Sequence, residues 1–250
     1  MLSSKLALYQ GPNVTVYVGQ TKETFQLPKL LLCYYSPYFD RAFNGEFIEA
    51  AEQSIHMQET SIEAFQALIQ FIYISQITFS TSMTDWKDRL TLLLEFLKTA
   101  DEITLLGDFE PFFAQVKEML IKAGQPLRLH VEKAMELPTG HAARKLVVDA
   151  CVLPYAEYLA AVTATLYKGR AELARDLVQM LEDSDTFAAE LFRAYSKSVL
   201  NKVPAHNSKS DSFVALFLIT VVKWQLYIDQ PPTAITLPRT NFLLRITLLQ

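Results

Sequence analysis

A short run of the chain, residues 27–43, constrains its fold more than any other feature. Pro28 lacks a backbone donor and suits the first turn of a helix, and two apolar helical turns follow it. Ser36 and Pro37 then interrupt this helix and start another, because a serine hydroxyl caps a helix N-terminus and proline fits its first position. The sequence therefore predicts two consecutive short helices, the second ending near Phe43.

The residues on either side of this run predict a small sheet. Residues 14–18 and 24–27 are rich in β-branched and aromatic side chains, and a glycine-containing turn separates them, which is the signature of a β-hairpin. A charged, turn-like stretch over residues 46–53 leads into a third short strand over residues 54–57. The expected sheet is thus interrupted by the two short helices.

The chain beyond this sheet is predicted to be helical. Thr60 and Glu63 form a capping box ahead of apolar residues at helical spacing, and that helix ends near Ser75. A leucine-dense helix runs from Trp86 to about Ile103. Further helices are expected over residues 109–122, 127–136, 142–153, 156–167, 171–182 and 186–201.

Composition argues against two classes of partner. The chain has 250 residues, of which 50% are apolar and 20% charged, enough apolar material for a packed core. Its net charge of -4 gives no field that attracts nucleic acid. The apolar run over residues 213–222 stops at Lys223, short of the ~18 residues that a membrane-spanning helix needs. We therefore expect no direct nucleic-acid partner and no membrane.

The sequence predicts no catalytic, cofactor-binding or metal-binding residues. Cys33 and Cys151 lie in apolar helical contexts, so we expect two buried thiols and an intracellular protein, cytoplasmic or nuclear. The four histidines have no partner at a metal-ligand spacing. Nucleophile elbows and phosphate-binding glycine loops are missing as well. A non-enzymatic protein without a cofactor is the expectation.

A cluster of aromatic and charged side chains is the best candidate for a binding surface. Two short helices cannot bury aromatic residues on every side, and exposed apolar groups with a charged rim are typical of protein interfaces. The alternative interpretation is that half or more of these aromatics belong to the core. The candidate partner-binding residues are Tyr35, Tyr38, Phe39, Asp40, Phe43, Glu46 and Phe47.

The order of these elements resembles the BTB/POZ domain, and in particular its many fungal members. The resemblance rests on the sequence of strands and helices and on Phe25, Lys29, Leu32, Ser36-Pro37-Tyr38-Phe39, Ala42-Phe43 and the step Gly45-Glu46-Phe47-Ile48-Glu49-Ala50. It implies an α+β fold, a short three-stranded sheet flanked by helices, followed by an all-helical extension.

Four segments follow from this resemblance and from the pattern of helices. We expect an N-terminal segment over residues 1–12, a BTB/POZ domain over residues 13–123 and a helical extension over residues 124–202. Residues 203–250 form a linker and tail to which the sequence assigns no fold.

The resemblance also implies a function in binding other proteins. BTB/POZ domains self-associate or dock partners, and some members recruit a cullin-3 ubiquitin ligase as substrate adaptors. In such an adaptor, the cullin contacts would lie around residues 40–47 and on the adjoining helices. Asn13 and Pro28 stand where relatives often have the Asp and His that support dimer geometry. Three alternatives stay open: a transcriptional or scaffolding co-regulator, an enzyme with a site between the two halves, and a purely structural homo-oligomer.

Overall fold

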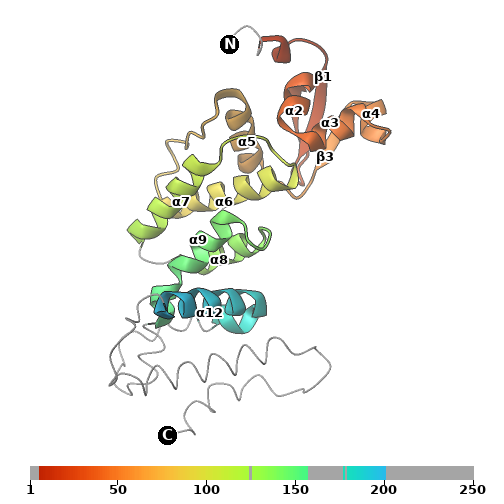
Figure 1. Cartoon of the computed structure of the whole chain (residues 1–250). Helices are drawn as coiled ribbons and strands as arrows, with labels where there is room; N and C mark the ends of the chain where they lie inside the picture. The colour runs from red at the N-terminus through yellow and green to blue at the C-terminus, as the bar shows by residue number, and fades with distance from the viewer. Residues whose placement is uncertain (1–5, 124–125, 157–176, 178, 201–250) are drawn as a thin grey trace, which may run out of the picture. The chain divides into compact units, whose positions relative to one another are not determined.

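A computed structural model of the protein describes residues 6–123, 126–156, 177 and 179–200. Figure 1 shows its elements in chain order, beginning with a short 3-10 helix, η1 (Ala7–Tyr9). The helix expected over residues 156–167, most of the one over residues 171–182, and the whole tail after residue 202 lie outside the described residues.

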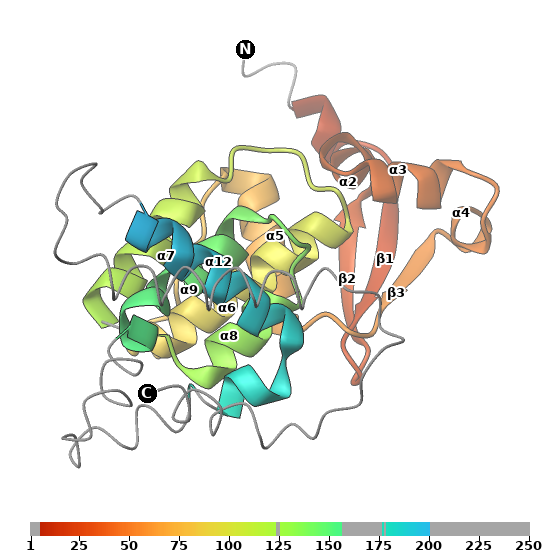
Figure 2. The ribbon, with the colours of Figure 1, turned by 60° about the horizontal axis from the view of Figure 1, so that its bottom comes forward.

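The predicted hairpin and third strand form one small sheet. β1 (Asn13–Val18) pairs antiparallel with β2 (Glu23–Pro28) and parallel with β3 (Ser54–Met57), so the strand order is β2-β1-β3. Figure 2 shows the strands side by side in this order. The even-numbered residues of β1 are buried, which is the period of a strand with one face on the core. The prediction of a three-stranded sheet is confirmed.

Ser36 joins the first two α-helices, α2 (Lys29–Tyr35) and α3 (Pro37–Asn44). Its hydroxyl accepts a hydrogen bond from the Phe39 amide at 3.2 Å, the N-cap that the sequence predicts. The same hydroxyl is fully buried and donates to the carbonyl oxygen of Ile103 at 2.6 Å. One side chain therefore starts α3 and connects it to a residue 67 positions further along the chain.

A short helix, α4 (Ile48–Glu52), stands where the sequence predicts a turn-like stretch. It ends at Gln53, whose backbone is left-handed with φ of 51°. The chain reaches α4 through Gly45, where a Cβ would overlap the carbonyl oxygen of Arg41. The prediction of a turn was wrong because five residues are too few for a helical period to show in the sequence.

Two longer helices follow, α5 (Ile62–Ile74) and α6 (Trp86–Glu102), close to their predicted bounds. The N-cap of α5 is Ser61, which accepts from the Ala64 amide at 3.2 Å. The predicted cap at Thr60 was therefore wrong by one residue. The Thr60 amide instead bonds to a strand carbonyl 3.4 Å away and closes the turn after β3.

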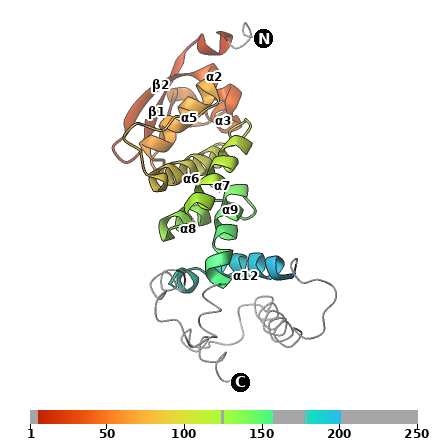
Figure 3. The same ribbon diagram turned by 90° about the vertical axis from the view of Figure 1, so that its left-hand side faces the viewer.

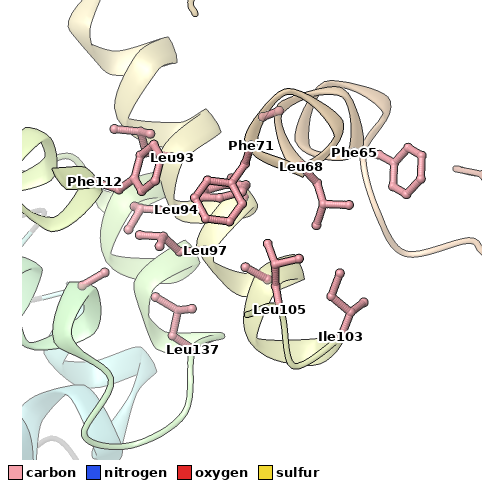
Figure 4. Packing of buried hydrophobic residues seen from close by; sticks show 14 of the residues in the cluster. Phe65, Leu68, Phe71, Leu93, Leu94, Leu97, Ile103, Leu105, Phe112 and Leu137 are labelled. Atoms are coloured by element: carbon pink, nitrogen blue, oxygen red, sulfur yellow. The ribbon is translucent and has the colours of Figure 1, made fainter. Parts of the chain in front are cut away.

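The core combines the sheet with several helices. Figure 3 shows α2, α3 and α5 beside the strands. Near α5, the ring centroids of Phe96, Phe109 and Phe112 lie 5.7, 5.3 and 5.6 Å from that of Phe71. Gly107 passes so close to the Phe71 ring that a Cβ there would overlap it. Figure 4 shows this packing through Phe65, Leu68, Phe71, Leu93, Leu94, Leu97, Ile103, Leu105, Phe112 and Leu137.

Two of the aromatics expected at a binding surface lie in this core. Phe39 and Phe43 are 0% and 1% exposed, and their rings stack with centroids 5.9 Å apart. They are four residues apart and so share one face of α3. Phe39 and Phe43 are therefore removed from the predicted partner-binding residues, because a side chain without exposed surface cannot contact a partner.

The helical continuation comprises α7 (Glu110–Ala123), α8 (Arg128–Met135), α9 (Ala142–Ala150) and α12 (Asp185–Leu200). α7 packs on α9, and α8 packs on α6. The buried guanidinium of Arg144 connects α9 to α12, because its Nε and Nη2 lie 3.1 and 2.7 Å from the carboxylate oxygens of a partly buried glutamate, Glu190. Such a bidentate pair fixes geometry as well as contributing energy.

Ion pairs connect α6 to α8 across the boundary predicted near residue 124. Lys98 lies 2.7 Å from Glu136, and Lys133 lies 3.1 Å from Glu95. Burial would raise the pKa of Glu136, but the hydrogen bond from Lys98 and the charge of Lys133 hold it below its ordinary value. One hydrophobic cluster runs through both segments, and a boundary at residue 124 stays a prediction.

Replacing Ser36 by alanine should destabilise the protein more than loss of an ordinary helix cap. The cap itself contributes about 1 kcal/mol. Each buried group left unpaired costs about 1–3 kcal/mol, so we expect the free energy of unfolding to fall by about 3 kcal/mol in urea titrations. The control is Ser61→Ala, a cap with partly exposed partners, which should cost about 1 kcal/mol. Equal losses would contradict a role for the bond to Ile103.

Phe43→Ala and Phe47→Ala should differ sharply in stability although they lie four residues apart. Phe43 is buried, and truncating a buried phenylalanine costs about 3–5 kcal/mol. Phe47 is 62% exposed, and its truncation should change the free energy of unfolding by less than about 0.5 kcal/mol. Thermal unfolding followed by circular dichroism separates the two. A large loss for Phe47→Ala would show that this ring is packed in solution.

Candidate functional site

The region of α3 and α4 presents the most exposed pair of adjacent apolar side chains in the part of the chain that the structure describes. Phe47 and Ile48 are 62% and 68% exposed. α4 packs on α3 and β3, and Figure 2 shows it next to the outer strand β3. We call this region the α4 surface, defined by Tyr38, Asp40, Arg41, Glu46, Phe47, Ile48, Glu49 and Glu52.

Carboxylates dominate the rim of the α4 surface. Its charged side chains are four acidic residues and Arg41, a net charge of -3. Within the described part of the chain, none of the four carboxylates forms an ion pair; Asp40 only accepts a hydrogen bond from Asn44 at 2.8 Å. Burial, and then the charge of Glu49, raises the pKa of Tyr38. The rim therefore presents free negative charge that favours a partner with basic residues.

Four of the seven residues that the sequence predicts for partner binding are exposed in the region of α3 and α4. Tyr38, Asp40, Glu46 and Phe47 lie at the α4 surface, and all four are exposed. Tyr35 is partly buried at the end of α2, where its carbonyl oxygen accepts from the Leu106 amide at 2.7 Å. The other two, as described above, belong to the core.

Sequence reasoning missed Ile48, Glu49 and Glu52, although the first two belong to the Gly-x-Phe-x-Glu-Ala step. The expectation of a turn hid them, because a turn gives no basis for grouping residues on one face. A helix starting at residue 48 would have placed Ile48 and Glu52 one turn apart. That spacing was the available signal.

A second exposed apolar region lies on η1, α2 and the end of α5. Leu30 and Tyr34 are four residues apart on α2 and therefore share a face. The ring centroids of Tyr9 and Tyr73 lie 5.4 Å apart, which joins η1 to α5. We call this region the α2 surface; its large exposed apolar side chains are Leu6, Tyr9, Leu30, Tyr34, Tyr73 and Ile74. A patch of this kind is typical of protein interfaces.

A polar groove of about 420 Å³ lies between the turns that follow β1 and β3 and the helices α6 and α8. Its side chains include the ion pairs of Lys98 with Glu136 and of Lys133 with Glu95. A general acid needs a raised pKa, whereas that of Glu136 is lowered. These two ion pairs join α6 to the end of α8.

Among the described residues, His130 and the two cysteines have no arrangement typical of a reactive site. His130 is fully buried; its Nδ1 accepts from the Leu127 amide at 3.2 Å, and its Nε2 lies 3.1 Å from the Lys87 carbonyl oxygen. Burial lowers the pKa of His130 and raises that of Cys151 to about 12. Cys33 is only partly buried, which corrects the expectation of two buried thiols.

The described ranges, 6–123, 126–156, 177 and 179–200, contain neither a metal-ligand cluster nor a membrane-spanning helix. No three metal-ligating side chains there are close enough together to hold an ion. No helix among these residues is both long and apolar enough to cross a membrane.

Comparison with known protein families gives a match to this part of the chain. The family model of the BTB/POZ domain matches residues 5–109, from the segment before η1 to the residue before α7. The match includes the sheet, the Ser36 junction and both exposed apolar surfaces. Residues 5–109 therefore match the BTB/POZ domain, a domain that mediates interactions between proteins.

Proposed function

We propose that the protein is a substrate adaptor that binds a cullin-3 ubiquitin ligase through its α4 surface. The observation that carries this proposal is the exposure of Phe47 and Ile48 on α4. If the protein is an adaptor, its resemblance to the BTB/POZ domain would imply cullin contacts in the same stretch, around residues 40–47, and on the adjoining helices. The proposal adds Ile48 and the carboxylates of α4 to that stretch.

The energetics of the α4 surface suit a small, strong contact. Fully burying a side chain such as Phe47 or Ile48 contributes about 1.5–3 kcal/mol each. Binding energy in protein interfaces concentrates in a few such anchors, surrounded by polar residues that contribute less. The unpaired carboxylates of the rim would act mainly on the rate of association with a basic partner, and therefore in a salt-dependent way.

A binding experiment with purified full-length chain and the N-terminal region of cullin-3 tests the adaptor role. We expect a dissociation constant in the micromolar range or below by calorimetry. Phe47→Ala and Ile48→Ala should each weaken binding about tenfold, the equivalent of 1.4 kcal/mol. The control is Ile74→Ala, which removes a similarly exposed apolar side chain from the α2 surface. No binding of the unmutated chain at micromolar concentration would exclude the adaptor role.

We propose further that the α2 surface pairs two copies of the chain. Six large apolar side chains are exposed on η1, α2 and the end of α5, elements that pack on one another, and exposed apolar surface of this kind is typical of protein interfaces. Asn13 and Pro28 replace residues that commonly support the dimer in relatives, so pairing would depend on these apolar contacts. A dimer that does not bind cullin-3 would instead fit a transcriptional or scaffolding co-regulator.

Light scattering coupled to size exclusion tests the pairing. The unmutated chain should have twice the 28.4 kDa mass of one copy. Tyr34→Lys places a charge on the α2 surface and should yield a monomer, since an unpaired charge is costly to bury. Phe47→Ala, at the other surface, should remain dimeric. A concentration of about 100 µM is far above the dissociation constant of a stable dimer. A monomeric mass for the unmutated chain at that concentration would rule the pairing out.

A further inference from the structure

Two side chains from different elements converge on one backbone atom beside the α4 surface. The carbonyl oxygen of Phe43 accepts a hydrogen bond from Lys29 Nζ at 2.9 Å and another from Gln53 Nε2 at 3.3 Å. The same Gln53 amide donates to the carbonyl oxygen of Ala50 at 2.5 Å. Lys29 begins α2, Phe43 lies near the end of α3, and Gln53 follows α4.

The Phe43 carbonyl lies near the end of α3, which explains why polar side chains donate hydrogen bonds to it. The last carbonyl groups of a helix have no partner within the helix, and the helix dipole favours a cation there. Lys29 supplies that cation to α3. Gln53 adopts a left-handed backbone, φ 51°, that is unfavourable for a residue with a side chain. Its two hydrogen bonds offset this strain and connect the end of α3 to the last turn of α4.

The junction fixes the part of the chain that carries the exposed apolar side chains. Residues 44–49 run between the two carbonyl groups that Gln53 contacts, and Phe47 and Ile48 lie in the middle of this stretch. α4 has only five residues, too few for a stable helix on its own. Its orientation therefore depends on contacts at its ends.

We infer that Lys29 and Gln53 are positioning residues of the α4 surface: they hold the Phe43 carbonyl and thereby set the affinity for the partner. Both side chains are partly buried, and the role requires no contact between them and the partner. The affinity part of this inference depends on the proposed function, whereas the conformation of residues 47–52 can be measured without a partner.

The experiment uses the full chain with four single substitutions. Lys29→Met removes the ammonium group at nearly constant length, and Lys29→Arg restores a charged donor. Gln53→Glu keeps the shape of the side chain but replaces its donor with a carboxylate that faces two carbonyl oxygens. Ala51→Glu adds the same charge to the exposed face of α4 without touching the Phe43 carbonyl, and is the matched control for charge.

We expect faster amide hydrogen exchange in residues 47–52 for Lys29→Met and Gln53→Glu, by about tenfold, with exchange in α6 unchanged. The dissociation constant for the N-terminal region of cullin-3 should rise about tenfold in the same two variants. Lys29→Arg should stay within about twofold of the unmutated chain in both measurements, and Ala51→Glu should leave the exchange of residues 47–52 within about twofold. Recovery by arginine would separate positioning from a general loss of stability.

The outcomes separate this inference from the proposed function. If the unmutated chain does not bind cullin-3, the adaptor role fails, and exchange in residues 47–52 alone decides whether Lys29 and Gln53 hold the surface. Unchanged exchange in both variants would overturn the inference. If the unmutated chain binds and exchange accelerates but the dissociation constant does not change, the claimed effect on affinity is overturned. An equal loss of binding in Ala51→Glu would assign the effect of Gln53→Glu to charge.

Discussion

The hydroxyl of Ser36 makes the hydrogen bonds on which the arrangement of the N-terminal domain depends. It accepts from the Phe39 amide and donates to the Ile103 carbonyl oxygen in a fully buried position. Next to it, the Leu106 amide donates to the carbonyl oxygen of Tyr35. Buried polar groups are costly when unpaired, so the end of α6 and the junction of α2 and α3 must stay together. This contact sets which face of α3 points inward.

The exposed surface follows from that orientation. Once Phe39 and Phe43 are turned into the core, the chain leaves α3 on its outer side, and Gly45 lets it turn closely past the Arg41 carbonyl. Phe47 and Ile48 then have no core to enter. Two large adjacent apolar side chains remain in water, which stabilises nothing in the isolated chain. Their exposure is consistent with the protein-binding function of the BTB/POZ domain that residues 5–109 match.

Charge is used in two different ways in this molecule. In the groove between α6 and α8, Lys98 and Lys133 satisfy the glutamates around them, so that those charges join helices. On the α4 surface, Asp40 and the glutamates of α4 have no ion pair among the described residues, and their field is available to a partner. These charges of the groove are thus paired between helices, whereas those of the α4 surface are not paired within the described part of the chain.

The sequence by itself determined the local features of this protein. The hairpin, the helix restart at Ser36 and the capped start of α5, to within one residue, depend on turn residues, caps and spacing, which act over a few positions. Only the tertiary structure decided that Phe43 is core while Phe47 is surface, because both are phenylalanines in similar sequence contexts. Their difference depends on which face of α3 meets the rest of the core, and that is set by the contact between Ser36 and Ile103. The short helix α4 was not predicted because contacts at its ends, rather than an internal helical period, hold it in place.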